Sequence, residues 1–231
     1  EDRKAIFGWA LYDWANSAFA TTVMASFFPI FFKGYWTVGS DPVISTARLG
    51  MANSAAGILV ALMAPVLGAM ADRGEAKKGF LLFFAAVGIL MTSALYFVPM
   101  GHWQAAAACY VLAMVGFAGS IVFYDSLLTT VAAEERRDFV SSLGFSLGYL
   151  GGGVLFALNV WMTLSPDAFG LSGSSEGVKL SFLSVGLWWA LFSLPLAFLV
   201  RERTGGTRKA PAAVIREGLA QLRDTLREIR R

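Results

Sequence analysis

Six long apolar runs alternate with short polar segments along the chain. The runs cover residues 6–32, 48–71, 79–98, 104–130, 139–162 and 178–200, and a polar segment at 33–47 separates the first two. Each run reaches the roughly 20 apolar residues that an α-helix needs to cross a bilayer. The pattern therefore predicts an all-α, integral, multi-pass membrane protein with six transmembrane helices.

Polar side chains interrupt the first run at helical spacing. Asp13, Ser17 and Thr21 recur every fourth residue, and Asn16 falls beside them on the same helix face. An Asp at the centre of a membrane helix costs roughly 2.5–3.5 kcal/mol, so such a group is kept where it is paired, faces water or takes part in function. For Ser17 and Thr21 simple helix packing stays an alternative; for Asp13 we expect a role in a pathway or a gate.

A second carboxylate, Asp125, follows Tyr124 near the end of the fourth run. A carboxyl group moved out of water binds a proton more readily. We hypothesise that Asp13 or Asp125 takes up a proton or binds a cationic group of a substrate. The alternative is a gate that hydrogen bonds keep closed. Tyr124 and the polar residues of the first helix complete the predicted pathway.

Glycines are concentrated in the fifth run. The positions of Gly144, Gly148, Gly151 and Gly152 give two overlapping small-xxx-small patterns. Such patterns let two membrane helices approach closely. They predict a helix that slides or bends against another half of the protein, and static packing is the alternative.

Composition and charge agree with a membrane protein. The 231 residues are 56% hydrophobic and 15% charged, whereas soluble domains carry about 25% charged residues. Of the 19 Lys and Arg residues, all but Lys33, Arg48 and Lys179 lie at the termini or in the loops on one side. The positive-inside rule then predicts cytoplasmic termini, here in a bacterial inner (plasma) membrane, and explains the basic excess without a nucleic-acid partner.

The inventory of reactive residues argues against an enzyme. The chain has one His and one Cys, and its sequence contains no spacing typical of a metal site, a nucleophile–base pair or a phosphate-binding loop. We therefore predict no catalytic residues, no metal and no cofactor.

Two regions follow from these patterns. Residues 1–202 are predicted to form the six-helix bundle, and residues 203–231 a cytoplasmic linker with a basic amphipathic helix. Apolar residues recur there at helical spacing, with Arg mostly off that stripe. They are Ile215, Leu219, Leu222, Leu226 and Ile229. Because the chain begins without Met, we expect it to be part of a longer protein.

The segment between the second and third helices resembles the loop 2–3 signature of the major facilitator superfamily. It contains Gly68, Asp72, Arg73 and Lys77. The resemblance implies a gate, in which Gly68 admits a close helix, Asp72 faces a helix N-terminus, and Arg73 and Lys77 bridge to helix ends. The pattern departs from the family at Gly74, which comes one residue early.

A more specific resemblance joins three helices. YDWANSAF at 12–19, FYD at 123–125 and GYLGG at 148–152 resemble the vacuole-effluxer-like family of major facilitator transporters. That family implies two six-helix halves, each with two inverted three-helix repeats. The first and fourth helices would line a cavity, the second and fifth would face the other half, and the third and sixth would face lipid. Asp125 departs from the family, which favours Asn there.

The resemblance implies a secondary active transporter that moves a small solute by alternating access. Fungal members of the family are associated with the export of amino acids, so amino acids are the implied substrate class. The implied partners are the C-terminal six-helix half of the same polypeptide, membrane lipid and a proton as coupling ion. Two alternatives stay open, namely a six-helix scaffold or receptor and a half-transporter that forms homodimers.

Overall fold

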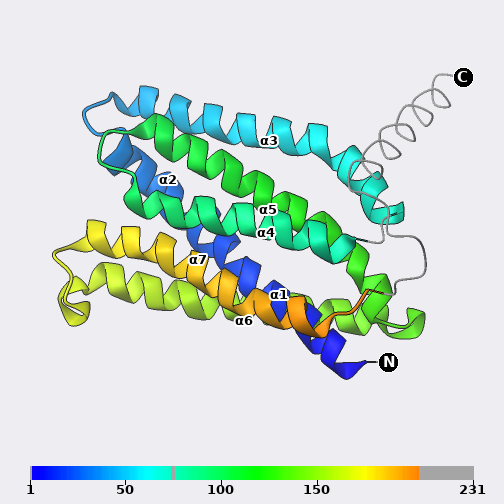
Figure 1. Cartoon of the computed structure of the whole chain (residues 1–231). Coiled ribbons are helices and arrows are strands. Elements are labelled where there is room, and N and C mark those ends of the chain that lie inside the picture. The colour runs from blue at the N-terminus through cyan, green and yellow to red at the C-terminus, as the bar shows by residue number, and fades with distance from the viewer. Residues whose placement is uncertain (1, 74–75, 203–231) are drawn as a thin grey trace, which may run out of the picture.

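The computed structural model describes residues 2–73 and 76–202, and in this part of the chain every regular element is a helix (Figure 1). The first crossing is a composite of four pieces. They are α1 (Arg3–Ala18), η1 (Phe19–Phe27), α2 (Phe28–Phe31) and η2 (Phe32–Trp36). The longer helices that follow are α3 (Pro42–Arg73), α4 (Lys77–Ala94), α5 (Trp103–Val131), α6 (Arg137–Leu164) and α7 (Ser174–Leu199). Short 3₁₀ turns flank them at η3 (Leu95–Phe97), η4 (Glu134–Arg136) and η5 (Pro166–Phe169).

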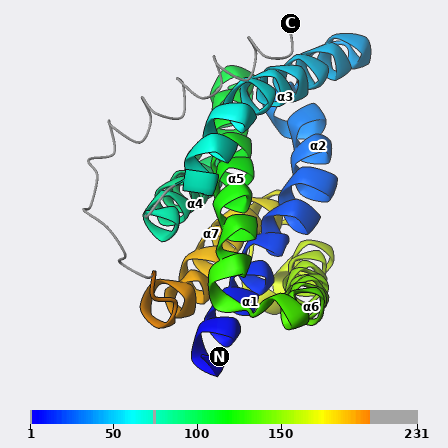
Figure 2. The same cartoon turned by 90° about the vertical axis from the view of Figure 1, so that its right-hand side faces the viewer.

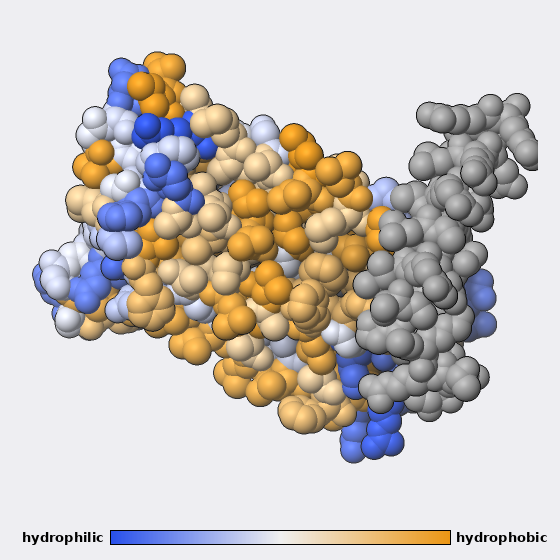
Figure 3. Space-filling model, turned by 45° about the horizontal axis from the view of Figure 1, so that its top comes forward, coloured by the Kyte–Doolittle hydropathy of each residue, from blue (hydrophilic) through white to orange (hydrophobic). Residues whose placement is uncertain are grey.

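Six helical segments are long and apolar enough to cross a membrane, which confirms the predicted fold class. They span Arg3–Trp36, Pro42–Asp72, Lys77–Phe97, Trp103–Val131, Glu134–Leu164 and Ser174–Leu199. On the face drawn in Figure 3, a broad hydrophobic band lies between more hydrophilic ends. Such a band matches the hydrocarbon layer of a bilayer.

The predicted loop at 33–47 is wrong in extent, because both neighbouring helices continue into it. The first crossing runs to Trp36, and α3 begins at Pro42. Proline suits the first turn of a helix, where its missing N–H has no partner to lose. The Asp41 carboxylate accepts a hydrogen bond of 2.7 Å from the Val43 N–H, which caps the new helix.

The first crossing lies inside the bundle, and α3 lies at its edge. α1 packs against α6 and α7, α4 packs against α5, and α3 packs mainly against α5 (Figure 2). The start of α1 and the end of α7 lie at one end of the bundle (Figure 1). We call it the basic end, since Arg3, Lys77, Arg136 and Arg201 belong to the segments that meet there.

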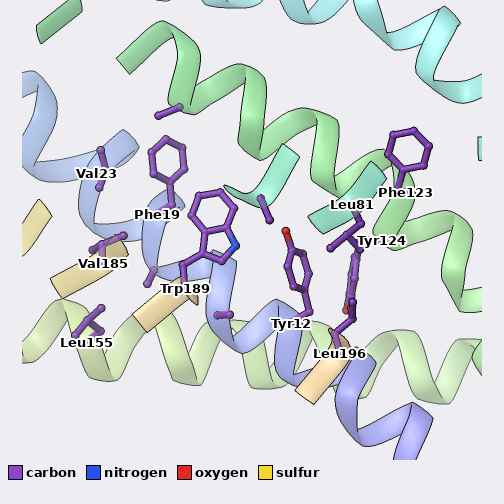
Figure 4. Packing of buried hydrophobic residues seen from close by; sticks show 14 of the residues in the cluster. Tyr12, Phe19, Val23, Leu81, Phe123, Tyr124, Leu155, Val185, Trp189 and Leu196 are labelled. Carbon is purple, nitrogen blue, oxygen red and sulfur yellow. The ribbon is translucent and has the colours of Figure 1, made fainter. Parts of the chain in front are cut away.

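Aromatic side chains fill the core on one side of α1. Tyr12 and Phe19 are fully buried, together with Phe123 of α5 and Trp189 of α7 (Figure 4). The rings of Phe19 and Trp189 lie 5.7 Å apart. With these large groups packed inward, the polar positions of α1 are turned to the other side. The predicted linker helix at 203–231 lies outside the described residues.

Candidate functional site

A cavity of about 800 Å³ lies between α1, η1, α5 and α6. Its lining contains all six residues that the sequence singled out for a substrate or proton pathway. They are Asp13, Asn16, Ser17, Thr21, Tyr124 and Asp125. The volume falls in the range of roughly 300–1,000 Å³ that is usual for small-molecule sites. Residues 112 positions apart in the sequence, Asp13 and Asp125, therefore contribute to one space.

Asp13 lies on α1, ten residues after Arg3, or about 15 Å along the helix. Its Oδ1 accepts a hydrogen bond from Ser17 Oγ at 3.4 Å, which is a long contact. Its other oxygen lies toward the backbone of Gly148 on α6. No Lys or Arg of the described residues forms an ion pair with this carboxylate. The Asp13 side chain is thus positioned by one hydrogen bond from Ser17 and by its packing against Gly148.

Asp125 lies six residues before the end of α5 and is exposed at the cavity. Within residues 2–73 and 76–202 its carboxylate has no hydrogen-bond or ion-pair partner. Asp13 and Asp125 line the same cavity. The cavity therefore contains two carboxylates whose charges nothing in the described chain neutralises.

Tyr124 and Trp9 form the wall beside these carboxylates. Their rings are stacked, with centroids 4.2 Å apart and planes 7° from parallel. The Trp9 indole N–H donates a buried hydrogen bond of 2.9 Å to the Tyr124 carbonyl oxygen. Tyr12 also packs against Tyr124, with ring centroids 5.4 Å apart (Figure 4). These contacts fix α5 against α1 and so determine where Asp125 lies relative to Asp13.

Thr21 lies where the first crossing changes its hydrogen-bond register. From Phe19 the helix becomes π-helical, with N–H groups bonded five residues back, as in the Phe28 N–H to Val23 oxygen bond. Such a change leaves carbonyl groups short of N–H partners. The Thr21 hydroxyl donates to the Ser17 oxygen at 3.0 Å and lies 3.3 Å from the Gly152 oxygen. The polar stripe thus joins η1 to α6.

The four predicted packing glycines face α1. They are Gly144, Gly148, Gly151 and Gly152. A Cβ atom at Gly148 would lie 2.7 Å from Ser17 Oγ and 2.9 Å from the Asp13 carboxyl carbon, and one at Gly151 would lie 2.6 Å from the Trp14 oxygen. Real Cβ atoms do not approach so closely. These glycines therefore pack α6 closely against the first crossing, as the packing alternative expects. That the helix slides or bends against another half stays a prediction.

The sequence argument missed the aromatic and hydroxyl wall of the cavity. The missed lining residues are Trp9, Phe117, Ile121, Leu128, Ser141, Ser142, Phe145 and Tyr149, and Gly148 was predicted only as a packing residue. Helical spacing could have found them. Trp9 precedes Asp13 by four residues, Phe117 and Ile121 precede Asp125 by eight and four, and Phe145 and Tyr149 repeat every fourth residue on α6.

Of the predicted gate residues, Lys77 contacts a neighbouring helix at the basic end. Lys77 Nζ donates to the Ser126 carbonyl oxygen at 3.3 Å, and Ser126 Oγ donates to the Ala71 oxygen at 3.0 Å, which joins α3, α4 and α5. Asp72 is exposed. No described atom lies within 4 Å of a Cβ built at Gly68, so the close helix approach expected there is absent from this part of the chain. The Arg73 side chain lies outside the described residues.

Lys78 adds a second connection at the same end. Its Nζ donates to the Ala197 oxygen at 3.1 Å and the Val200 oxygen at 2.8 Å, where α7 ends. Its backbone N–H donates to the Glu202 carboxylate at 2.8 Å.

Within the described residues, 2–73 and 76–202, no group of three His, Cys, Asp or Glu side chains lies close enough together to bind a metal ion.

Comparison with known proteins gives one family. The chain matches the family model described as "Vacuole effluxer Atg22 like" over residues 37–138 and 129–231. It is 36% identical, over 224 residues, to an uncharacterised MFS-type transporter, YxiO, of Bacillus subtilis, covering 96% of this chain and 52% of that protein. It is 22% identical to autophagy-related protein 22 of Eremothecium gossypii, covering 86% of this chain and 46% of the relative. The chain thus spans about half the length of these relatives, and no solved structure matches it.

Proposed function

Because this chain belongs to the vacuole effluxer Atg22-like family of major facilitator transporters, we propose that it is one half of a secondary active transporter. In this proposal it moves a small solute across a membrane by alternating access. The observation that carries the proposal is the cavity in which two carboxylates from α1 and α5 meet without a described counter-charge. Ionisable groups at membrane depth mark substrate and ion pathways, because their burial is costly otherwise.

The other half of the transporter is proposed to be a C-terminal six-helix bundle of the same polypeptide. Several helices have apolar faces that the described residues leave uncovered, and two of them, α3 and α6, are proposed to face this second half. On α3 these include Met51, Ile58 and Leu62, and on α6 they include Leu150 and Val154. α3 and α6 correspond to the second and fifth membrane crossings, and each would belong to one of two inverted three-helix repeats.

Solute, coupling and orientation belong to the same proposal. Amino acids are the proposed substrate class, in keeping with the family resemblance, and Asp13 or Asp125 is the proposed proton carrier. The basic end would face the cytoplasm of a bacterium by the positive-inside rule. Residues 68–77 would act as the gate at this end, with Lys77 bridging to the end of α5 in the state described here.

The proposal is tested by transport measurements on the full-length protein in liposomes. Uptake of a mixture of labelled amino acids is recorded at several external pH values, with and without an imposed proton gradient. Asp13→Asn is expected to abolish gradient-driven uptake while leaving exchange of solute across the membrane. The control is Asp138→Asn, which changes an exposed carboxylate outside the cavity. Transport by Asp13→Asn that still follows the proton gradient would exclude the coupling role of Asp13, and no solute movement by the wild-type protein would contradict transport of amino acids.

A further inference from the structure

The charge in the cavity has one sign. Asp13 and Asp125 are its only ionisable carboxylates, and the lining of the described part of the cavity includes no Lys, Arg or His. The remaining polar groups are neutral hydroxyls and one amide. In a low-dielectric surrounding, two unneutralised carboxylates attract a cation and repel an anion more strongly than they would in water.

The walls around the carboxylates are aromatic. Five of the lining residues carry rings: Trp9, Phe117, Tyr124, Phe145 and Tyr149. Phe145 and Tyr149 meet edge to face, with centroids 4.9 Å apart and planes at 82°. Their side chains are 63% and 66% exposed, so α6 presents ring surface that no described residue covers. Ring faces attract ammonium groups and pack against hydrocarbon.

Two buried polar groups of the lining also lack partners. Asn16 is 1% exposed, and its Nδ2 has no hydrogen-bond partner among the described residues. The Tyr124 hydroxyl is buried and equally without one in that part of the chain. Unsatisfied buried polar groups cost free energy and are uncommon in native proteins. Asn16 lies three residues after Asp13, so its side chain falls on the same helix face as that carboxylate.

We infer that this cavity is a binding site for a protonated amine with an apolar or aromatic body. The ammonium group binds at Asp13 and Asp125, and the hydrocarbon part packs against the rings of α5 and α6. The inference deepens the proposed function and rests on it only for the statement that the bound amine is transported. It excludes acids without an amine as ligands of this half.

The test compares three compounds that share a phenyl body and differ in charge. They are 2-phenylethylamine, 2-phenylethanol and 3-phenylpropanoate, which at neutral pH are a cation, a neutral molecule and an anion. Binding to the full-length protein in detergent is measured by isothermal titration calorimetry. The amine is expected to bind saturably and at least about tenfold more tightly than the alcohol, and the anion is expected not to bind. Equal affinities for amine and alcohol would overturn the inference.

Variants locate the site. Asp13→Asn and Asp125→Asn are each expected to weaken amine binding about tenfold or more, and Asp138→Asn to leave it unchanged. Asp125 is exposed, so its substitution is not expected to impair folding; thermal melting and size-exclusion profiles check this for each protein. Amine binding without transport in liposomes would contradict the proposed function alone. Amine binding that survives both cavity substitutions would contradict the site.

Discussion

At the scale of single residues, the unusual feature is a carboxylate that lies against a glycine. Asp13 approaches the backbone of Gly148, and its hydroxyl partner Ser17 lies on the same surface. A side chain at position 148 would therefore displace the proposed ligand group directly. The glycine serves both the close approach of α6 to α1 and the position of Asp13.

Gly148→Ala is expected to destabilise the full-length protein by about 1–3 kcal/mol, as overpacked sites usually do. It is also expected to weaken amine binding, because the new Cβ would meet the Asp13 carboxyl carbon at 2.9 Å. The measurement is thermal melting with and without 2-phenylethylamine.

Gly153→Ala is the matched control on the same helix. Nothing lies within 4 Å of its added Cβ among the described residues, so within this half only helix propensity changes, in favour of alanine. If the two variants melted alike, the α1–α6 contact would not depend on Gly148 as argued.

At the scale of elements, the six crossings were predictable and the path of the first one was not. Long apolar runs bounded by polar segments fix where helices cross, and each predicted run falls within an observed span or extends one residue beyond it. The π-helical register of η1 has no sequence marker, because it depends on how Thr21 and the side chains of the neighbouring helices meet freed carbonyl groups. α3 begins at Pro42, earlier than predicted, because the sequence argument assigned the capping residue Asp41 to a loop.

Thr21→Val is expected to destabilise the junction of α1 and η1 by about 1–2 kcal/mol, because it removes the hydroxyl donor to the Ser17 oxygen while keeping the side-chain shape. Thr163→Val is the control. Its hydroxyl bonds to Asn159 four residues back in a regular part of α6, where that carbonyl also belongs to the helix ladder. The melting temperatures of both variants test this prediction. An equal loss of stability at the two positions would argue against a special role for Thr21.

The contact between α4 and the end of α7 gives a second prediction at this scale. Lys78 Nζ bonds to carbonyl groups of Ala197 and Val200, which the end of a helix leaves without N–H partners. Lys78→Ala is expected to increase hydrogen exchange at residues 197–202 about fivefold, as a loss of about 1 kcal/mol implies. Lys33→Ala, at an exposed position on η2, should leave that exchange unchanged, because η2 contacts α7 at Phe182, well before residues 197–202. Unchanged exchange in Lys78→Ala would show that α7 ends stably without this lysine.

At the scale of the whole molecule, the polar half of the cavity was predictable from sequence and its apolar half was not. An Asp, Asn or Thr inside an apolar run is conspicuous because lipid disfavours it. Phe145 and Tyr149 carry no such signal, since aromatic residues are equally suited to lipid and to a cavity. The rotation of α6, with its glycines against α1, places these two residues in the lining of the cavity that contains Asp13.

Apolar faces of α3 and α7 that the described residues leave uncovered are the basis of the last prediction. Leu62 on α3 is 69% exposed, and Phe198 on α7 is 76% exposed. If α3 packs against a second six-helix half, Leu62 lies at an interface and Phe198 stays in lipid. In a cysteine-free full-length protein, Leu62→Cys is expected to react at least about tenfold more slowly than Phe198→Cys with a membrane-soluble maleimide. Faster or equal reaction at position 62 would mean that α3 faces lipid. The second six-helix half would then not pack against α3.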